Sequence, residues 1–362
     1  MTTAPLSPPG THRPHPHRTV EDGREKLRQV APGLTLAVLV ALAATELGGF
    51  VPVIGAPVFG IVLGLLLAAA ITPHSGLTAG FDFAAKPVLQ TSIVVLGATL
   101  SLRQVAIVGL SSLPVMLGTL AVALLGAFVL GRVLGVRGDA QLLIGVGTGI
   151  CGASAIAAVT AVLKPRQTQV AYAIGTIFMF NVAAVLLFPV LGHAWHLSAH
   201  SFGLWAGTAV NDTSSVVAAA YSFSTAAGPY ALVVKLTRTL TLIPIVLILG
   251  IWHTRRAARA TTSADAVTGP ARLPWRKIVP LFLFGFLATS ALDTIGVIPS
   301  GWQPSITHAG TFLITVALSG IGLSLRWNNI RSAGVRPLLL GGCLWVLVTA
   351  SSLGLQALTH TL

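Results

Sequence analysis

Long stretches without a charged side chain constrain this sequence more than any other feature. Residues 111–131 and 338–358 contain no Asp, Glu, Lys or Arg, and each stretch is long enough to cross roughly 30 Å of hydrocarbon as a helix. Only 9% of the chain is charged, against about 25% in soluble domains. The apolar stretches also lack the strict alternation of membrane β-strands. The sequence therefore predicts an all-α integral membrane protein, folded as a polytopic helical bundle.

The positive charge of the chain is spread over its connections. The 22 Lys and Arg residues give a net charge of +13, but they do not form one basic, aromatic-rich face of the kind that binds nucleic acid. They follow the rule that Lys and Arg gather in cytoplasmic loops, so no nucleic acid partner is expected. The two cysteines, Cys151 and Cys343, lie in different apolar segments, which supports neither a disulfide framework nor a metal site.

The chain divides into a short tail and one membrane domain. Residues 1–32 are rich in Pro and His and lack an apolar period, so we expect a disordered basic tail. No cleavable signal pattern follows its basic residues, which predicts a cytoplasmic N-terminus. Residues 33–362 then form a single transmembrane domain with repeat-related halves, and a dense group of basic residues marks a cytoplasmic linker at about 253–277.

The distribution of basic loops suggests that two apolar segments do not span the membrane. If every segment spanned, Lys164 and Arg166 would lie outside and the 193–200 connection, which has no Lys or Arg, would lie inside. Both loops move to the expected faces if segments 140–163 and 202–227 dip in and return. We therefore predict nine spans and two re-entrant hairpins, with broken full spans as the alternative. The eleven apolar segments are 33–50, 53–72, 87–102, 111–132, 140–163, 168–192, 202–227, 230–252, 275–295, 306–325 and 335–358.

An internal repeat accompanies this pattern. Residues 97–118 align with residues 320–341 without a gap, with nine identities over 22 positions, which is more than shared apolar composition readily produces. In the predicted topology Arg103 faces outside and Arg326 inside, so the two copies run in opposite senses across the membrane. Inverted repeats of this kind are typical of secondary transporters.

Two further segments combine glycine with small hydroxyl residues inside apolar runs. Residues 147–154 and 207–214 resemble each other at an offset of 60. Such residues lower helix propensity and let half-helix N-termini present N–H donors to an anion, although tight helix packing by small residues is the other interpretation. The candidate binding residues in the two segments are Gly147, Thr148, Gly149, Cys151, Gly152, Ser154, Asn211, Asp212, Thr213 and Ser214.

Asp212 is the strongest single candidate, because it lies in the middle of an apolar segment. A carboxylate at the centre of a bilayer costs roughly 2.5–3.5 kcal/mol on insertion scales, so it needs a partner, a cavity or a proton. Lys235 and Arg238 lie one turn apart on the helix that follows. They are expected either to neutralise Asp212, to form a cationic wall for an anion, or to extend toward a helix end.

Residues 147–158 resemble the glycine-rich signature of the bacterial sulfate exporter family, whose members are uncharacterised multi-pass inner-membrane proteins. The resemblance continues through 207–220, 235–238, 273–275, 320–325 and 333–340, so it covers nearly everything after residue 32. Some members have His-Glu where this chain has Asn211-Asp212, so the carboxylate is kept and an imidazole is missing. More distantly, the chain resembles the bile acid, arsenite and riboflavin transporter superfamily, which implies inverted repeats and unwound crossing helices.

The residues and the resemblance together favour a secondary transporter in the bacterial inner membrane. We expect it to export a small anion such as sulfate, sulfite or an organosulfonate, coupled to a proton or sodium gradient. The alternative is a cation-coupled carrier of an organic solute in which Asp212 binds the ion. The sequence has no His-Glu-x-x-His and no nucleotide-binding motif, so neither enzyme activity, a cofactor nor ATP-driven pumping is expected. The lipid bilayer is the expected surrounding, and assembly into a homo-oligomer is left open.

Overall fold

A computed structural model describes residues 18–50, 55–70, 75–260, 281–324 and 334–361. Every regular element in these ranges is helical, which confirms the all-α prediction. The elements are α1 (Arg18–Phe50), α2 (Gly55–Ala70), α3 (Ser75–Phe83), the π-helix η1 (Ala84–Val88), α4 (Leu89–Gly97), α5 (Leu102–Val133), α6 (Asp139–Gly149), α7 (Ala153–Leu163), α8 (Gln167–Ala194), α9 (Ala199–Ala209), α10 (Thr213–Phe223), α11 (Ala227–Leu240), α12 (Leu242–Ala260), α14 (Leu281–Thr294), the 3-10 helix η2 (Ser300–Trp302), α15 (Gln303–Ser324) and α17 (Val335–Leu358).

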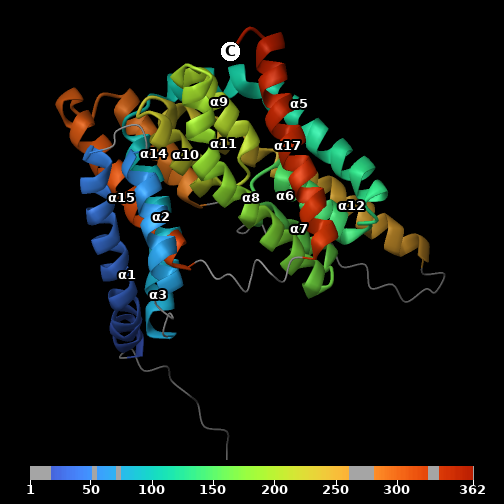
Figure 1. The fold of residues 1–362 in the computed structure, drawn as a ribbon, viewed down its shortest axis with the longest axis horizontal. Helices are drawn as coiled ribbons and strands as arrows, with labels where there is room; N and C mark the ends of the chain where they lie inside the picture. The colour runs from blue at the N-terminus through green and yellow to red at the C-terminus, as the bar shows by residue number, and fades with distance from the viewer. Residues whose placement is uncertain (1–17, 51–54, 71–74, 261–280, 325–333, 362) are drawn as a thin grey trace, which may run out of the picture.

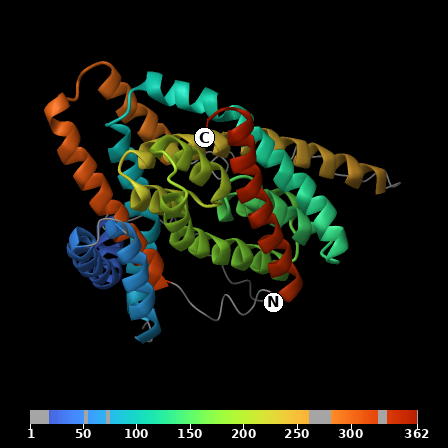
Figure 2. The same cartoon turned by 45° about the horizontal axis from the view of Figure 1, so that its top comes forward.

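The helices form two groups that lie side by side. Helices α1–α4, α14 and α15 pack together and are called the N-terminal group. Helices α5–α12 and α17 make up the second, which is called the hairpin group. Figures 1 and 2 show the blue helices and the orange α15 on one side, and the green helices with the red α17 on the other. Six helical segments in the described residues are long and apolar enough to cross a membrane.

Both glycine-rich segments fold back as hairpins. Helix α7 ends beside the start of α6, since Leu163 lines the same cavity of about 680 Å³ as Gly138 and Asp139. Phe202 at the start of α9 stacks on Phe223 at the end of α10, with ring centroids 4.0 Å apart. Each hairpin therefore returns to the edge from which it entered, as the basic loops predict. In the described residues the other α-helices make nine segments when α3–η1–α4 and α11–α12 are each counted once.

The two copies of the internal repeat run in opposite directions. Gly310 near the start of α15 lies against Leu96 near the end of α4, and Gly320 near the end of α15 lies against Ala84. The second helices of the copies are also antiparallel, because Gly118 of α5 lies against Leu355 of α17, while Gly126, further along α5, lies against the earlier Leu344. This is the arrangement expected of repeats inverted across a membrane.

Two predicted boundaries differ from the structure. Residues 18–32, expected in a disordered tail, are helical, because elongating an existing helix adds hydrogen bonds without the cost of nucleation. Residues 1–17 lie outside the described residues. The segment predicted at 87–102 belongs to a helix that starts at Ser75, since Asp82 and Lys86 interrupt the apolar run in the sequence but not the helix. The linker predicted at about 253–277 overlaps the end of α12, and its remainder lies outside the described residues.

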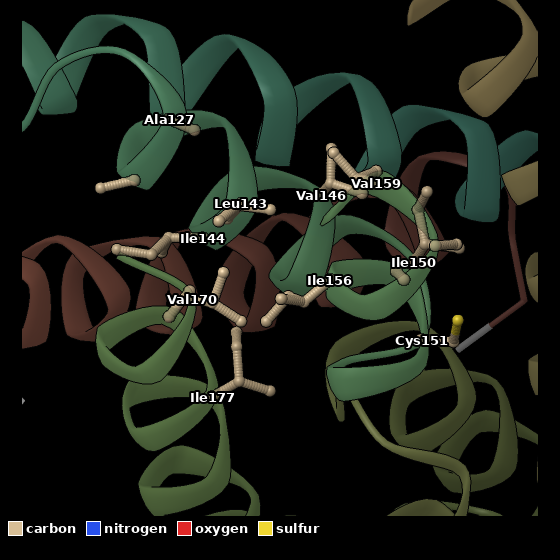
Figure 3. Close-up of a cluster of buried hydrophobic side chains, with 14 of the residues drawn as sticks. Ala127, Leu143, Ile144, Val146, Ile150, Cys151, Ile156, Val159, Val170 and Ile177 are labelled. Carbon is tan, nitrogen blue, oxygen red and sulfur yellow. The ribbon is translucent and has the colours of Figure 1, made fainter. Parts of the chain in front are cut away.

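The first hairpin is held in an aliphatic cluster. Figure 3 shows Ile144 and Ile156 of the hairpin close to Val170 and Ile177 of α8, with Cys151 at the margin of the cluster. The side chains of Leu143, Ile144 and Ile156 are fully buried. Burying each such side chain contributes roughly 1.5–3 kcal/mol. The position of the helix break is therefore fixed by packing on both arms of the hairpin.

One edge of the bundle collects the basic side chains. Gly135, after α5, lies against the Arg336 side chain at the start of α17, and Arg132, Arg137, Lys164 and Arg166 lie at helix ends on this same edge. The turns on the opposite edge, at 98–101, 195–198, 224–226 and 295–299, contain no Lys or Arg, although Arg103 follows the first of them in the first turn of α5. Since basic residues resist translocation, the basic edge is expected to face the cytoplasm.

This orientation is tested by labelling single cysteines at Gln167 and Ser300, which are both exposed. In a chain with Cys343→Ser, we expect Gln167→Cys to react with a membrane-impermeant maleimide only in inverted vesicles. Ser300→Cys should react in intact cells. The buried Cys151 is the internal control and should stay unlabelled in both. Labelling of both introduced cysteines from the same side would rule out this orientation.

Candidate functional site

The two hairpins touch at their breaks. Helix α6 ends at Gly149 and α7 begins at Ala153, while the second hairpin is interrupted between Ala209 and Thr213. A Cβ on Gly152 would lie 3.5 Å from the Cα of Asp212. Gly152 has φ +67°, a backbone conformation that favours glycine. We refer to residues 150–152 and 210–212 as the crossing.

Lys235 of α11 joins the two breaks. Its fully buried Nζ donates hydrogen bonds to the carbonyl oxygens of Ile150 at 2.8 Å and Val210 at 2.9 Å. These residues are the C-caps of α6 and α9. Arg238, also fully buried, donates from a guanidinium nitrogen to the carbonyl of Thr208. Carbonyls at a helix end lack a partner within the helix and find no water in hydrocarbon, so both cations satisfy acceptors that would otherwise be orphaned.

Close packing of α9 on α11 brings Lys235 to the crossing. A Cβ on Gly207 would lie 2.7 Å from Val234 Cγ1 and 3.0 Å from the carbonyl oxygen of Ala231. A Cβ on Gly203, one turn earlier, would lie 3.1 Å from the carbonyl oxygen of Ala227. Small residues at these positions let the two backbones approach, as is common between membrane helices.

A cavity of about 600 Å³ lies between the N-terminal group and the hairpin group. The first turns of α7 and α10 face it through Ala153, Ser154 and residues 213–215. A helix N-terminus carries unpaired N–H donors and a partial positive charge, so two of them at one cavity favour an anion. The lining residues are Ile61, Asp82, Ala85, Lys86, Leu89, Gln90, Ile93, Cys151, Ala153, Ser154, Ile174, Ile177, Phe178, Asn181, Val182, Asp212, Thr213, Ser214, Ser215, Thr239, Leu242, Phe282, Ile321 and Ser324.

Asp212 lines the cavity and also caps the N-terminus of α10. It is the N-cap of α10, and its carboxylate accepts hydrogen bonds from the Ser214 backbone N–H at 3.0 Å and from the Ser214 hydroxyl. Its backbone N–H donates to Asn181 Oδ1 of α8 at 3.3 Å. The carboxylate is only partly buried and lines the cavity. Capping therefore fixes a negative charge beside the N-terminus of α10.

The structure adds residues that the sequence did not single out. Asp82, Lys86 and Gln90 line the wall of the cavity opposite the hairpins. Lys86 lies in the π-helix η1, whose Pro87 lacks the N–H that a regular α-helical turn would use. The signal in the sequence was the i, i+4 pair of opposite charges at Asp82 and Lys86. Because this pair interrupts an apolar run, the hydropathy pattern indicates a connection there, whereas the structure places Asp82 in α3 and Lys86 in η1.

The predicted site residues divide into three sets. Cys151, Ser154, Asp212, Thr213 and Ser214 line the cavity together. Lys235 and Arg238 reach carbonyls at the hairpin breaks and are not part of its lining. The remaining predicted residues lie in or next to the breaks, outside the lining, and are Gly147, Thr148, Gly149, Gly152 and Asn211.

These remaining residues differ in what surrounds them. A Cβ on Gly147 would lie 3.0 Å from Ile156 Cδ1, so this glycine lets the arms of the first hairpin close. Gly149 packs in the same way against Leu120 of α5. Thr148 Oγ1 and Asn211 Oδ1 are buried, and neither atom has a hydrogen-bond partner among the described residues.

Comparisons with known proteins cover most of the chain. The family described as conserved hypothetical protein 698 matches residues 32–341. A UPF0324 membrane protein of Streptococcus pneumoniae is 40% identical over 334 residues, covering 90% of this chain and 96% of the relative. A UPF0324 membrane protein of Fusobacterium nucleatum is 37% identical over 344 residues, with the same coverage. These names state a membrane location and give no substrate.

The close approach of α9 to α11 yields a prediction about Gly207. We expect Gly207→Ala to lower the free energy of unfolding by about 1–3 kcal/mol, because the new methyl group overlaps Val234 and displaces Lys235 from the crossing. The thermal unfolding midpoint in detergent measures the effect. Gly354→Ala is the matched control, since it is also helical and has nothing within 4 Å of its added Cβ. That control should leave the midpoint unchanged or raise it, and equal losses in the two variants would contradict the packing argument.

Proposed function

This chain belongs to the conserved hypothetical protein 698 family of UPF0324 membrane proteins, and we propose that it is a secondary transporter of a small anion. The substrate class is sulfate, sulfite or an organosulfonate, moved outward across the bacterial inner membrane. Coupling is to a proton or sodium gradient. Transport, and not intramembrane catalysis or a cofactor-dependent reaction, is the function that the site supports best.

The single observation that carries this proposal is the convergence of two half-helix N-termini on one cavity. Ser154 of α7 and Thr213 to Ser215 of α10 present their first turns to the same space. Each N-terminus carries roughly half of a positive elementary charge. The α7 end has no side-chain cap, whereas the Asp212 carboxylate caps the α10 end. Discontinuous helices whose N-termini point at an anionic group are a recurring device of transporters.

The opposite wall offers a second contact for an anion. Among the residues that line the cavity, Lys86 is the one with a cationic side chain, and Gln90 lies one turn further along the same helix. The aliphatic and aromatic side chains of Leu89, Ile174 and Phe178 fill much of the remaining wall. An anionic group with an organic portion, such as an organosulfonate, matches both surfaces.

The two-group architecture supports an alternating-access cycle. The cavity lies between the N-terminal group and the hairpin group, so rocking one group against the other would open it to either side of the membrane. Asp212 faces the cavity and is proposed to bind the coupling proton or cation. A carboxylate that gains and loses a proton beside the anion site links the two fluxes.

A second candidate is a cation-coupled carrier of an organic solute. It is favoured by the presence of two carboxylates, Asp82 and Asp212, on facing walls of the cavity. In this case the carboxylates bind the cation, and the apolar lining binds the solute. The substrate arms of the flux experiment separate this candidate from the anion transporter.

Flux measurements test the role of Asp212. In proteoliposomes, labelled sulfate, sulfite and taurine should be tested under imposed pH and sodium gradients, and we expect gradient-driven flux of at least one of them. Asp212→Asn should abolish the coupled flux without loss of folded protein, because asparagine is as good an N-cap as aspartate but cannot be charged. Asp139→Asn at the start of α6, outside this cavity, is the control and should transport normally. Normal coupled flux in Asp212→Asn over the whole pH range would show that this carboxylate is structural.

Replacement of Lys86 tests the anion specificity. We expect Lys86→Gln to weaken the apparent affinity for the transported anion by roughly 10- to 150-fold, since one charged hydrogen bond of about 1.5–3 kcal/mol is lost. The folded state should be unaffected, because the Lys86 side chain is exposed and lines the cavity. Unchanged affinity for all three anions would remove Lys86 from the proposed site.

A further inference from the structure

The electrostatics of the crossing single out a cation position. Helices α6 and α9 each contain 11 residues and end at the crossing with their C-terminal carbonyls directed to one point. A helix C-terminus carries a partial charge of roughly −0.5, so the two together present roughly −1. One monovalent cation offsets this charge at the point where the two ends meet, and Arg238 donates to the Thr208 carbonyl two residues earlier on α9.

The ammonium group of Lys235 occupies that point. Its Nζ lies 2.8 Å from the Ile150 oxygen and 2.9 Å from the Val210 oxygen, and the side chain is fully buried. No carboxylate of the described residues forms an ion pair with it, so the two helix ends are its counter-charge. Two other charged groups act on it electrostatically, Arg238 on the same helix and Asp212 at the crossing.

Broken helices in transporters generally use such carbonyls differently. Unwound backbone carbonyls and half-helix C-termini coordinate the free coupling cation there. We propose that Lys235 is a tethered cation that permanently fills a monovalent-cation position at the crossing, so the two hairpins are held together without Na⁺. The Lys235 nitrogen is covalently attached and therefore stays at this position through the cycle, whereas a free ion would bind and leave.

The position of Lys235 at the crossing does not depend on the proposed function. Its consequence for coupling does, since it applies only if the chain is a transporter. With the crossing filled by Lys235, the transport cycle needs no Na⁺ at this position. Flux driven by a pH gradient should then proceed at an unchanged rate when choline replaces sodium. The ion position itself is tested without any substrate, through stability and Na⁺ binding.

The experiment compares the wild-type protein with Lys235→Ala in detergent. In the wild type, the thermal unfolding midpoint should be the same in NaCl and in choline chloride, and ²²Na⁺ should show no saturable binding. In Lys235→Ala, which leaves two carbonyls without a donor, the midpoint should be lower in choline. Saturating NaCl or methylammonium chloride should raise it by roughly 2–4 °C or more, with one ²²Na⁺ bound per chain.

Lys164→Gln is the control, because Lys164 is exposed at the end of α7 and its loss creates no buried acceptor. It should behave like the wild type in every salt. Saturable ²²Na⁺ binding by the wild type would overturn the proposal, and so would a folded Lys235→Ala that responds to neither cation.

A second variant covers failure of Lys235→Ala to fold. Lys235→Gln keeps amide donors for the two carbonyls without the charge, and it should fold with a lower midpoint that NaCl does not restore. A Lys235→Gln protein as stable as the wild type would show that hydrogen bonding, and not the positive charge, is what the crossing requires. Absence of flux for all tested anions would remove the proposed function but leave these binding results as they stand.

Discussion

The hydrogen bonds from Lys235 to Ile150 and Val210 are the interaction on which the site depends. A hairpin that stops inside a membrane leaves carbonyl groups at its break, and hydrocarbon offers them no donor. One side chain from α11 supplies donors to both breaks at once, and Arg238 supplies a third to Thr208. Without a donor at this point, both carbonyls would be buried and unsatisfied, which costs about 1–3 kcal/mol for each group.

The same interaction determines which helix ends face the cavity. Because the negative ends of α6 and α9 meet Lys235, the positive ends of α7 and α10 are left to face the cavity between the two helix groups. The Asp212 carboxylate lies beside one of these positive ends as an N-cap. Lys235 and Arg238 therefore stabilise the breaks through backbone carbonyls. The helix N-termini and Lys86 on the facing wall would bind the proposed anion.

Much of the fold could be predicted from the sequence because the position of single basic residues in the loops depends on membrane topology. Lys164 and Arg166, set against the uncharged 193–200 connection, were enough to indicate two hairpins, and the repeat ending at Gly118 and Gly341 indicated antiparallel copies. The start of α3 was missed, because Asp82 and Lys86 lower the local hydropathy although they face a cavity and not lipid. The start of α1 was missed as well, since its first turns have no apolar period. A hydropathy pattern cannot distinguish a polar residue in a loop from one that lines an internal space.

The sequence by itself determined that this chain is a helical membrane protein with inverted repeats and two glycine-rich interruptions, because apolar length, basic loops and small residues act locally. It also indicated Asp212, Ser154 and Lys235 as candidate binding residues, because they are polar residues within apolar segments. Only the tertiary structure decided which of them share a cavity and that Lys235 points to backbone carbonyls instead of that cavity. The position of the Lys235 side chain depends on how closely α9 approaches α11, and that contact joins residues that are separated in the sequence, such as Gly207 and Val234.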